Sequence, residues 1–251
     1  CTQCFTQHSA ARLTCYQHLQ PFFLQETLQP GQVRAFSRAI YAFKCNEFSV
    51  LQNDRSIKMM RLQNINLSLS MLIDAEGYLA SARYIASPNC DERPDRNDIS
   101  LLVIHAISLP PEEFSGTGVI ELFTNQLNPQ AHPYYQTLTD LKVSSHFFIR
   151  RNGEIIQFVP CLLRAWHAGT SSWQGRTCCN DFSIGIELEG SDNQPFEPQQ
   201  YTRLIKLTQA LQATYPICDI AGHADIAPQR KTDPGPHFDW RGYREALGAI
   251  R

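Results

Sequence analysis

The order of hydrophobic and polar residues predicts several short strands in the part of the chain after residue 70. Residues 100–107 form a continuous apolar run, which is typical of a strand buried on both faces. Residues 145–150 and 154–159 predict two more strands, joined through Asn152 and Gly153. Asn-Gly is the strongest short hairpin signal, since both turn positions favour positive φ. Residues 182–188 predict a further strand.

Helical spacing begins at Pro198. Hydrophobic residues recur at helical intervals from there to Leu211, and Pro216 closes the pattern. A short helix is predicted over residues 238–247. Strands interspersed with helices, together with one hairpin, indicate an α/β (α+β) fold: a single domain with a mixed central β-sheet flanked by helices.

The first 70 residues lack this pattern. They hold one glycine, Gly31, of the 13 in the chain, and their hydrophobic residues keep neither a helical nor a strand period. We therefore expect an unassigned N-terminal extension over residues 1–70 and one domain over residues 71–251. Because residue 1 is a cysteine and a methionine stands at the junction, we hypothesise that the native product starts at Met71.

One spacing within the extension is compatible with metal binding. Cys1 and Cys4 are followed by Cys15 and His18, which is a ligand set that closes tetrahedral structural zinc sites. No recognisable zinc finger surrounds these residues, so chance spacing is the favoured interpretation.

Composition limits the class of protein and its partners. The chain of 251 residues is 43% hydrophobic and 18% charged, as expected of a globular protein, and its net charge of −2 suggests neither nucleic acid nor an anionic membrane as partner. No apolar run reaches the roughly 18 residues that span a bilayer. The nine cysteines are odd in number, and we see no signal peptide, so we expect reduced thiols and a cytoplasmic protein.

Two histidines and a carboxylate are candidate metal ligands. His105 is the polar residue within an apolar strand, and a buried imidazole needs a partner. His223 follows a glycine in AGHADIAP, and Asp233 lies ten residues further on in KTDPGP. Two imidazoles and a carboxylate leave a fourth position open, as in catalytic zinc sites. The alternative is that each histidine is a satisfied structural residue, the commoner role of a lone histidine.

Two acids and a lysine complete the candidate chemistry. Glu187 and Glu189 point to the same face of the predicted strand 182–188, opposite its isoleucines. One of them is a candidate general base that activates a zinc-bound water, unless the strand is a solvated edge. Lys231 precedes Asp233 by two residues and is suited to stabilise an oxyanion, unless it is an ordinary surface lysine.

These stretches together resemble the AmpD branch of the N-acetylmuramoyl-L-alanine amidase family, the type 2 amidases related to peptidoglycan recognition proteins. The motifs occur in the family's order between about residue 98 and residue 240, and a weaker match extends back to Met71. They are LLVIHAISLPP, NPQAHPYY, IRRNGEIIQFVP, RAWHAG, CNDFSIGIELEG, GHADIAPQRKTDPGP and FDW.

The resemblance implies a role for each matching residue. His105, His223 and Asp233 are expected to bind Zn2+, Glu187 to orient and deprotonate the water, and Lys231 to hold the oxyanion. The implied reaction is hydrolysis of the amide bond between (1,6-anhydro-)N-acetylmuramic acid and L-alanine of muropeptides, without a covalent intermediate.

The resemblance also implies a substrate groove. Arg164, Trp166 and His167 of RAWHAG are expected to lie along it, and Lys142 stands where relatives often keep an arginine that recognises a carboxylate. Ala106 departs from the asparagine usual in relatives, which removes a polar contact near the metal. The polar, proline-bearing stretch 108–133 is a candidate lid.

The implied biological role is peptidoglycan recycling in the cytoplasm, with an anhydro-muramyl peptide as substrate and the enzyme as a monomer. Two other functions remain open at this point. One is a non-catalytic module that binds muropeptides, and the other is an exported amidase that acts on the polymeric cell wall.

Overall fold

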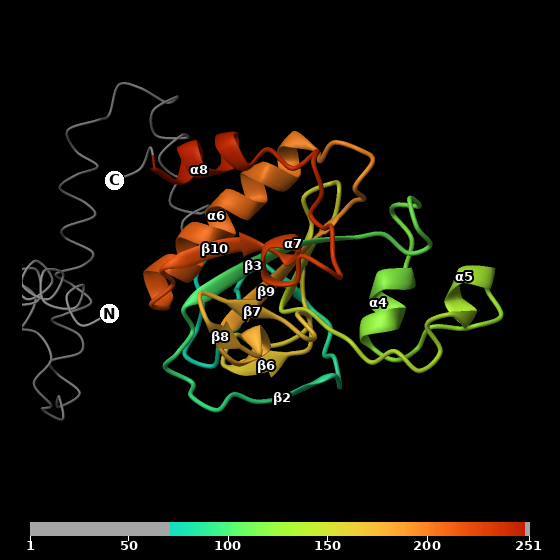
Figure 1. Cartoon of the computed structure of the whole chain (residues 1–251), viewed down its shortest axis with the longest axis horizontal. Helices are drawn as coiled ribbons and strands as arrows, with labels where there is room; N and C mark the ends of the chain where they lie inside the picture. Colours follow the sequence, from blue (N-terminus) through green and yellow to red (C-terminus); the bar gives the residue numbers. More distant parts are fainter. Residues whose placement is uncertain (1–70, 249–251) are drawn as a thin grey trace, which may run out of the picture. The chain divides into compact units, whose positions relative to one another are not determined.

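A six-stranded mixed sheet forms the centre of the protein. The computed structural model describes residues 71–248, drawn in colour in Figure 1. Strand β9 lies between β4 and β3 and is parallel to both, β10 is parallel to β3, and β4 is antiparallel to β5, which confirms the predicted mixed sheet. In order across the sheet, the strands are β1 (Arg83–Tyr84), β5 (Ile155–Gln157), β4 (Phe147–Ile149), β9 (Ser183–Glu189), β3 (Leu101–Ile107) and β10 (Asp219–Gly222).

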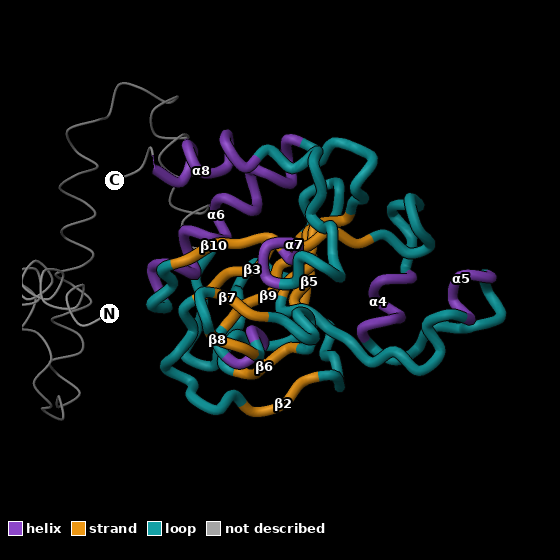
Figure 2. Tube along the Cα trace, viewed as in Figure 1, coloured by secondary structure: helices purple, strands orange, loops and turns teal. Residues whose placement is uncertain are grey.

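Helices and short strands surround this sheet. Two helices cover one face, whereas α4 and α5 lie together beyond one side of it (Figure 1). Long loops connect the elements, and two small two-stranded sheets lie among them (Figure 2). The helices are α4 (Gly118–Phe123), α5 (Pro133–Gln136), α6 (Pro198–Thr214), α7 (His223–Ile226), α8 (Trp240–Gly248) and the 3-10 turn η1 (Cys179–Asp181). The small sheets pair β2 (Cys90–Glu92) with β6 (Leu163–Ala165) and β7 (Ser172–Trp173) with β8 (Arg176–Thr177).

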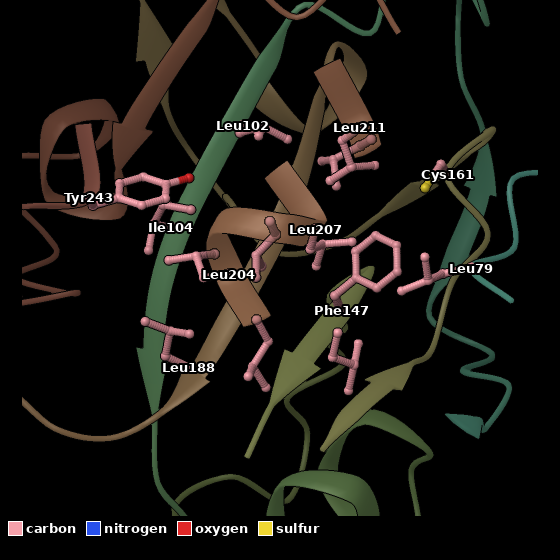
Figure 3. Close-up of a cluster of buried hydrophobic side chains, with 14 of the residues drawn as sticks. Leu79, Leu102, Ile104, Phe147, Cys161, Leu188, Leu204, Leu207, Leu211 and Tyr243 are labelled. Atoms are coloured by element: carbon pink, nitrogen blue, oxygen red, sulfur yellow. The ribbon is translucent and has the colours of Figure 1, made fainter. Parts of the chain in front are cut away.

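The main core lies between the sheet and α6 and α8. Leu204, Leu207 and Leu211 of α6 are fully buried, and they pack against alternate residues of the strands (Figure 3). Leu102 and Ile104 of β3 belong to this cluster. Because side chains alternate along a strand, the intervening residues of β3 and β9 project from the opposite face, which no long helix within residues 71–248 covers.

The predicted elements occur close to their expected bounds, but the hairpin turn differs from its prediction. Gly153 has φ of +81°, whereas Asn152 does not lie in the positive-φ region. The amide of Gly153 donates to the carbonyl of Arg150, whose own amide donates to the carbonyl of Glu154. The connection is therefore a type I turn followed by a left-handed glycine, which is the usual three-residue hairpin loop.

The C-terminal helix begins two residues later than predicted. Phe238 packs in the core among the aromatic rings of Tyr201 and Trp240. Asp239 then accepts a hydrogen bond from the amide of Gly242 at 2.9 Å, so it caps the helix that starts at Trp240.

The predicted N-terminal extension, including the candidate ligands from Cys1 to His18 and the hypothesis of a start at Met71, lies outside the described residues. Within residues 71–248, none of the helices has the length and apolar character that a membrane span requires.

Candidate active site

Three adjacent parallel strands bring the candidate residues to one level of the sheet. His105 of β3 and Glu187 of β9 are register partners. Gly222, the last residue of β10, pairs with Ile104, so His223 comes beside His105 at the next position. The carboxyl ends of parallel strands are the usual place for a ligand site in such sheets.

The nitrogen atoms of two histidines and one carboxylate oxygen form a triangle. Nδ1 of His105 lies 2.9 Å from Nδ1 of His223 and 3.2 Å from Oδ2 of Asp233. The third side, between His223 Nδ1 and Asp233 Oδ2, measures 3.1 Å. The amide of Ala224 donates to the carbonyl of Asp233 at 2.8 Å, which ties the loop that carries the carboxylate to the helix that begins at His223.

This triangle fits a zinc ion. Zinc holds nitrogen and oxygen ligands at about 2.0–2.1 Å in a tetrahedron, so its ligand atoms stand roughly 3.3 Å apart. The three sides match that spacing, and two imidazoles with one carboxylate are a ligand set of catalytic zinc. Nε2 of His223 lies 3.2 Å from the carbonyl of Ala168. Since a carbonyl only accepts, this nitrogen carries the proton and Nδ1 is left with a free lone pair.

The ionisation of the ligands suits a metal. Burial lowers the pKa of His105 to about 4, although the neighbouring Asp233 carboxylate acts in the opposite direction. Burial acts to raise the pKa of Asp233, but the neighbouring His105 and His223 outweigh it, so that pKa falls well below its ordinary value. A neutral imidazole and an ionised carboxylate are the forms that bind metal.

Glu187 is a buried carboxyl group that points at this triangle. Its Oε1 lies 3.9 Å from Nδ1 of His105, and its Oε2 has no hydrogen-bond partner among the described residues. Burial, reinforced by the negative charge of Asp233, raises the pKa of Glu187 well above its ordinary value, while Lys231 opposes the shift. A carboxyl group with a raised pKa and a free oxygen is suited to take a proton from water.

A cleft of about 620 Å³ opens onto the site. Glu187, His223, Asp233 and Lys231 line it. An apolar part of its wall includes Leu122 and other residues from α4, α5 and the segment that follows them. The volume is typical of pockets that bind small molecules.

The stretch 108–133, predicted as a candidate lid, contributes to this wall. It includes α4, whose Leu122 and Phe123 are buried in a second apolar cluster on the sheet face opposite α6. The segment is therefore partly ordered by packing rather than being a long open loop.

The four residues predicted to line a substrate groove differ in their position relative to this cleft. Arg164 forms two hydrogen bonds of 2.6 Å with Asp91 and one of 2.5 Å with Asp181, and it does not line the cleft. Trp166 does not line the cleft either, and Lys142 lines a smaller neighbouring pocket. His167 does line the cleft, but its ring is 8% exposed and Nδ1 lies 2.9 Å from Nε2 of His105.

Sequence analysis overlooked two small residues of β9, Ser183 and Gly185. They alternate with Glu187 and therefore share its face of the sheet. A Cβ atom on Gly185 would lie 2.5 Å from Cγ of His167, so the glycine makes room for that ring. The alternation of side chains along the strand, which indicated Glu187, also indicates Ser183 and Gly185.

Alternation along the strand does not by itself identify a site residue, as Glu189 shows. Glu189 points to the same face as Glu187, but its carboxylate accepts hydrogen bonds from the backbone amides of Ser115 at 2.6 Å and Arg151 at 2.9 Å. It therefore connects loops to the strand and takes no part in the triangle.

The fold and the site define a mixed α/β protein with a candidate metal-dependent hydrolase site. Residues 95–236 match the family model described as N-acetylmuramoyl-L-alanine amidase, which covers more than half of the chain. The chain therefore belongs to the N-acetylmuramoyl-L-alanine amidase family and is an enzyme of that family.

Curated relatives and a solved structure agree with this assignment. The 1,6-anhydro-N-acetylmuramyl-L-alanine amidase AmpD of Citrobacter freundii is 55% identical over 176 residues, which cover 69% of this chain and 94% of the relative. AmpD of Escherichia coli (strain K12) is 54% identical over 178 residues, 69% of this chain and 96% of the relative. The crystal structure of a selenomethionine derivative of AmpD superposes with a TM-score of 0.69 at 55% identity, covering 70% of this chain and 99% of that one.

Proposed function

We propose that the protein is a zinc-dependent amidase that cleaves the bond between the lactyl group of 1,6-anhydro-N-acetylmuramic acid and L-alanine. The observation that carries this proposal is the placement of Glu187 beside the triangle of His105, His223 and Asp233, with Glu187, His223 and Asp233 in the lining of one cleft. The anhydro sugar is inferred from relatives whose names specify it and that match over 94–96% of their length.

Each residue of the site has a task in this reaction. His105, His223 and Asp233 would hold the metal. A bound zinc ion supplies Lewis-acid polarisation and makes a water molecule acidic near neutral pH. Glu187 accepts the proton of the attacking water with its carboxylate and can then pass it to the leaving nitrogen of L-alanine. Lys231 places a positive charge in the cleft, where it stabilises the negative charge that develops on the amide oxygen.

The lining of the cleft is also suited to exclude bulk water while a substrate is bound. Its walls combine the charged residues of the Asp233 loop with apolar side chains of the α4–α5 segment, such as Leu138 and Leu141. A substrate that packs against the apolar wall displaces bulk water from the cleft. Electrostatic interactions within the cleft then become stronger.

We further propose that this reaction serves peptidoglycan recycling in the cytoplasm. No disulfide joins the five cysteines that the structure describes, Cys90, Cys161, Cys178, Cys179 and Cys218, as expected in a reducing compartment. Fractionation of cells that express the native gene tests this part, and recovery in the periplasm would favour the exported amidase instead.

The test of the chemistry is an assay of the full chain with anhydro-muramyl tripeptide, with and without a chelator. Free tripeptide should appear only in the metal-loaded protein, and zinc should restore the chelated sample. Glu187→Gln keeps the shape of the side chain but removes the base, so it should bind zinc and substrate without turnover.

Glu189→Gln is the matched control, because Glu189 lies two residues further along the same strand face and its carboxylate bonds to Ser115, Arg150 and Arg151 rather than to the triangle. This variant should retain turnover. A wild-type protein that binds the muropeptide but releases no tripeptide would instead support a non-catalytic recognition module.

A further inference from the structure

We propose that His167 is a positioning residue: a relay from Ser183 through His167 holds His105 in the one tautomer that can bind a metal through Nδ1. The proposal deepens the proposed function and rests on it, because it concerns the ligand that a zinc ion would meet. It replaces the substrate-groove role that resemblance implies for His167.

The direction of the relay follows from one carbonyl group. Oγ of Ser183 lies 2.5 Å from the carbonyl oxygen of Cys179, and it must donate there because the carbonyl has no proton. Nε2 of His167 lies 3.1 Å from the same hydroxyl oxygen. Since the hydroxyl proton is already used, the hydroxyl accepts from His167, and Nε2 of His167 carries the proton.

The next step fixes His105. With its proton on Nε2, the neutral ring of His167 presents Nδ1 as an acceptor. This atom lies 2.9 Å from Nε2 of His105, which must therefore donate. Nδ1 of His105 is left without a proton, and it is the atom that faces His223 and Asp233. Metal-binding histidines characteristically donate their second ring nitrogen to a partner in this way.

The surroundings hold the relay rigidly. Ser183 and His105 are essentially fully buried and His167 is 8% exposed, so water does not compete strongly for their hydrogen bonds. Gly185 leaves the space that the His167 ring occupies above β9. Asn180 also fixes the backbone beside the ring, because its side-chain oxygen accepts from the amides of His167 and Ala168 at 3.1 and 2.8 Å.

The first test measures zinc affinity of the full chain by competition with a chelating dye. His167→Phe keeps an aromatic ring but removes both nitrogens, and it should weaken zinc binding by about 10- to 100-fold, the range found for such outer partners. His167→Asn keeps an oxygen acceptor where Nδ1 stands and should recover much of this loss. Ser183→Ala should weaken zinc binding by a smaller factor. The hydroxyl that favours the Nε2–H tautomer of His167 is lost, but the His167 ring remains.

Thr208→Val is the control for a lost buried hydrogen bond. Thr208 bonds to Tyr243 at 2.6 Å within the cluster on the opposite face of the sheet, so its replacement should leave zinc affinity unchanged. Folded His167→Phe and Ser183→Ala proteins with wild-type zinc affinity would overturn the proposal.

The second test reads the tautomer directly. Long-range ¹H–¹⁵N spectra of the zinc-free wild-type protein should show His105 protonated on Nε2, and the Nδ1–H form should appear in Ser183→Ala. Protonation of wild-type His105 on Nδ1 would refute the relay. Failure of the wild type to bind zinc would count against the proposed function. The tautomer of His105 in the zinc-free protein would still show whether the relay exists.

Discussion

Oε1 of Glu187 lies 3.9 Å from Nδ1 of His105, across two parallel strands in which these residues are register partners. The sheet therefore fixes the separation between the proposed base and one proposed metal ligand. A loop would allow both groups to move, whereas β9 and β3 are buried central strands.

Replacing Glu187 should separate chemistry from metal binding. In Glu187→Gln, kcat should fall by about 10²- to 10⁴-fold, the usual contribution of a general base. Zinc content should stay near one ion per chain, because the triangle is intact. Steady-state kinetics with metal analysis check both, and a kcat within tenfold of the wild type would exclude Glu187 as the base.

Replacing Glu189 should lower stability and leave catalysis intact. Glu189→Gln weakens the charge-assisted hydrogen bonds from Ser115 and Arg151, each type worth about 1.5–3 kcal/mol. We expect a lower free energy of unfolding in urea titrations and a kcat close to that of the wild type. A variant that is stable but inactive would show that this second carboxylate takes part in the reaction.

Zinc should stabilise the folded protein, because the triangle of ligands exists only in the native state. At a free zinc concentration of 100 times Kd, the stabilisation should be about 2.7 kcal/mol. Thermal unfolding with and without chelator measures it. Asp233→Ala removes one corner of the triangle, so its Tm should respond much less to zinc, and an equal response would place the ion elsewhere.

Much of this site could be predicted from the sequence because alternation along a strand is a local property. The apolar run containing His105 and the strand containing Glu187 each indicated which face their side chains share. Strand β10 escaped prediction, since four residues containing a glycine and an aspartate carry little strand signal, and only its pairing with β3 orders it.

Side-chain directions outside the predicted strands could not be inferred in the same way. Arg164 points to Asp91, which lies 73 residues earlier in the chain, and to Asp181. His167 lies at the site, where its Nδ1 is 2.9 Å from Nε2 of His105. Both outcomes depend on partners brought together by folding, and no local pattern encodes them.

Acid should destabilise the fold through His146. Burial, with the nearby Arg93 guanidinium, lowers the pKa of His146 well below its ordinary value of 6.5. Nδ1 of this ring accepts from the amide of Gly185 at 3.0 Å, so a second proton has no acceptor there. The unfolded chain binds the proton near its ordinary pKa and the native ring does not, so stability present above that pKa is lost as pH falls.

Thermal unfolding should therefore show a falling Tm between about pH 7.5 and about pH 5, the range where unfolded histidine gains its proton. His146→Gln should reduce the slope, whereas His237→Gln, at an exposed position, should not. If His146→Gln fails to fold, an NMR titration of the wild type decides, and His146 signals that titrate near the ordinary value would contradict the assignment.

Gly185→Ala should disturb the site from within the sheet. The added Cβ would lie 2.5 Å from Cγ and 2.6 Å from Nδ1 of His167, so the ring must move. Overpacking of this kind costs about 1–3 kcal/mol of stability. The same movement should lengthen the contact with His105 and weaken zinc binding.

Gly116→Ala is the control, because the nearest atom to its Cβ is 3.9 Å away. Equal stability and zinc affinity in both variants would show that His167 has room to adapt, and that its contact with His105 is looser than the structure indicates.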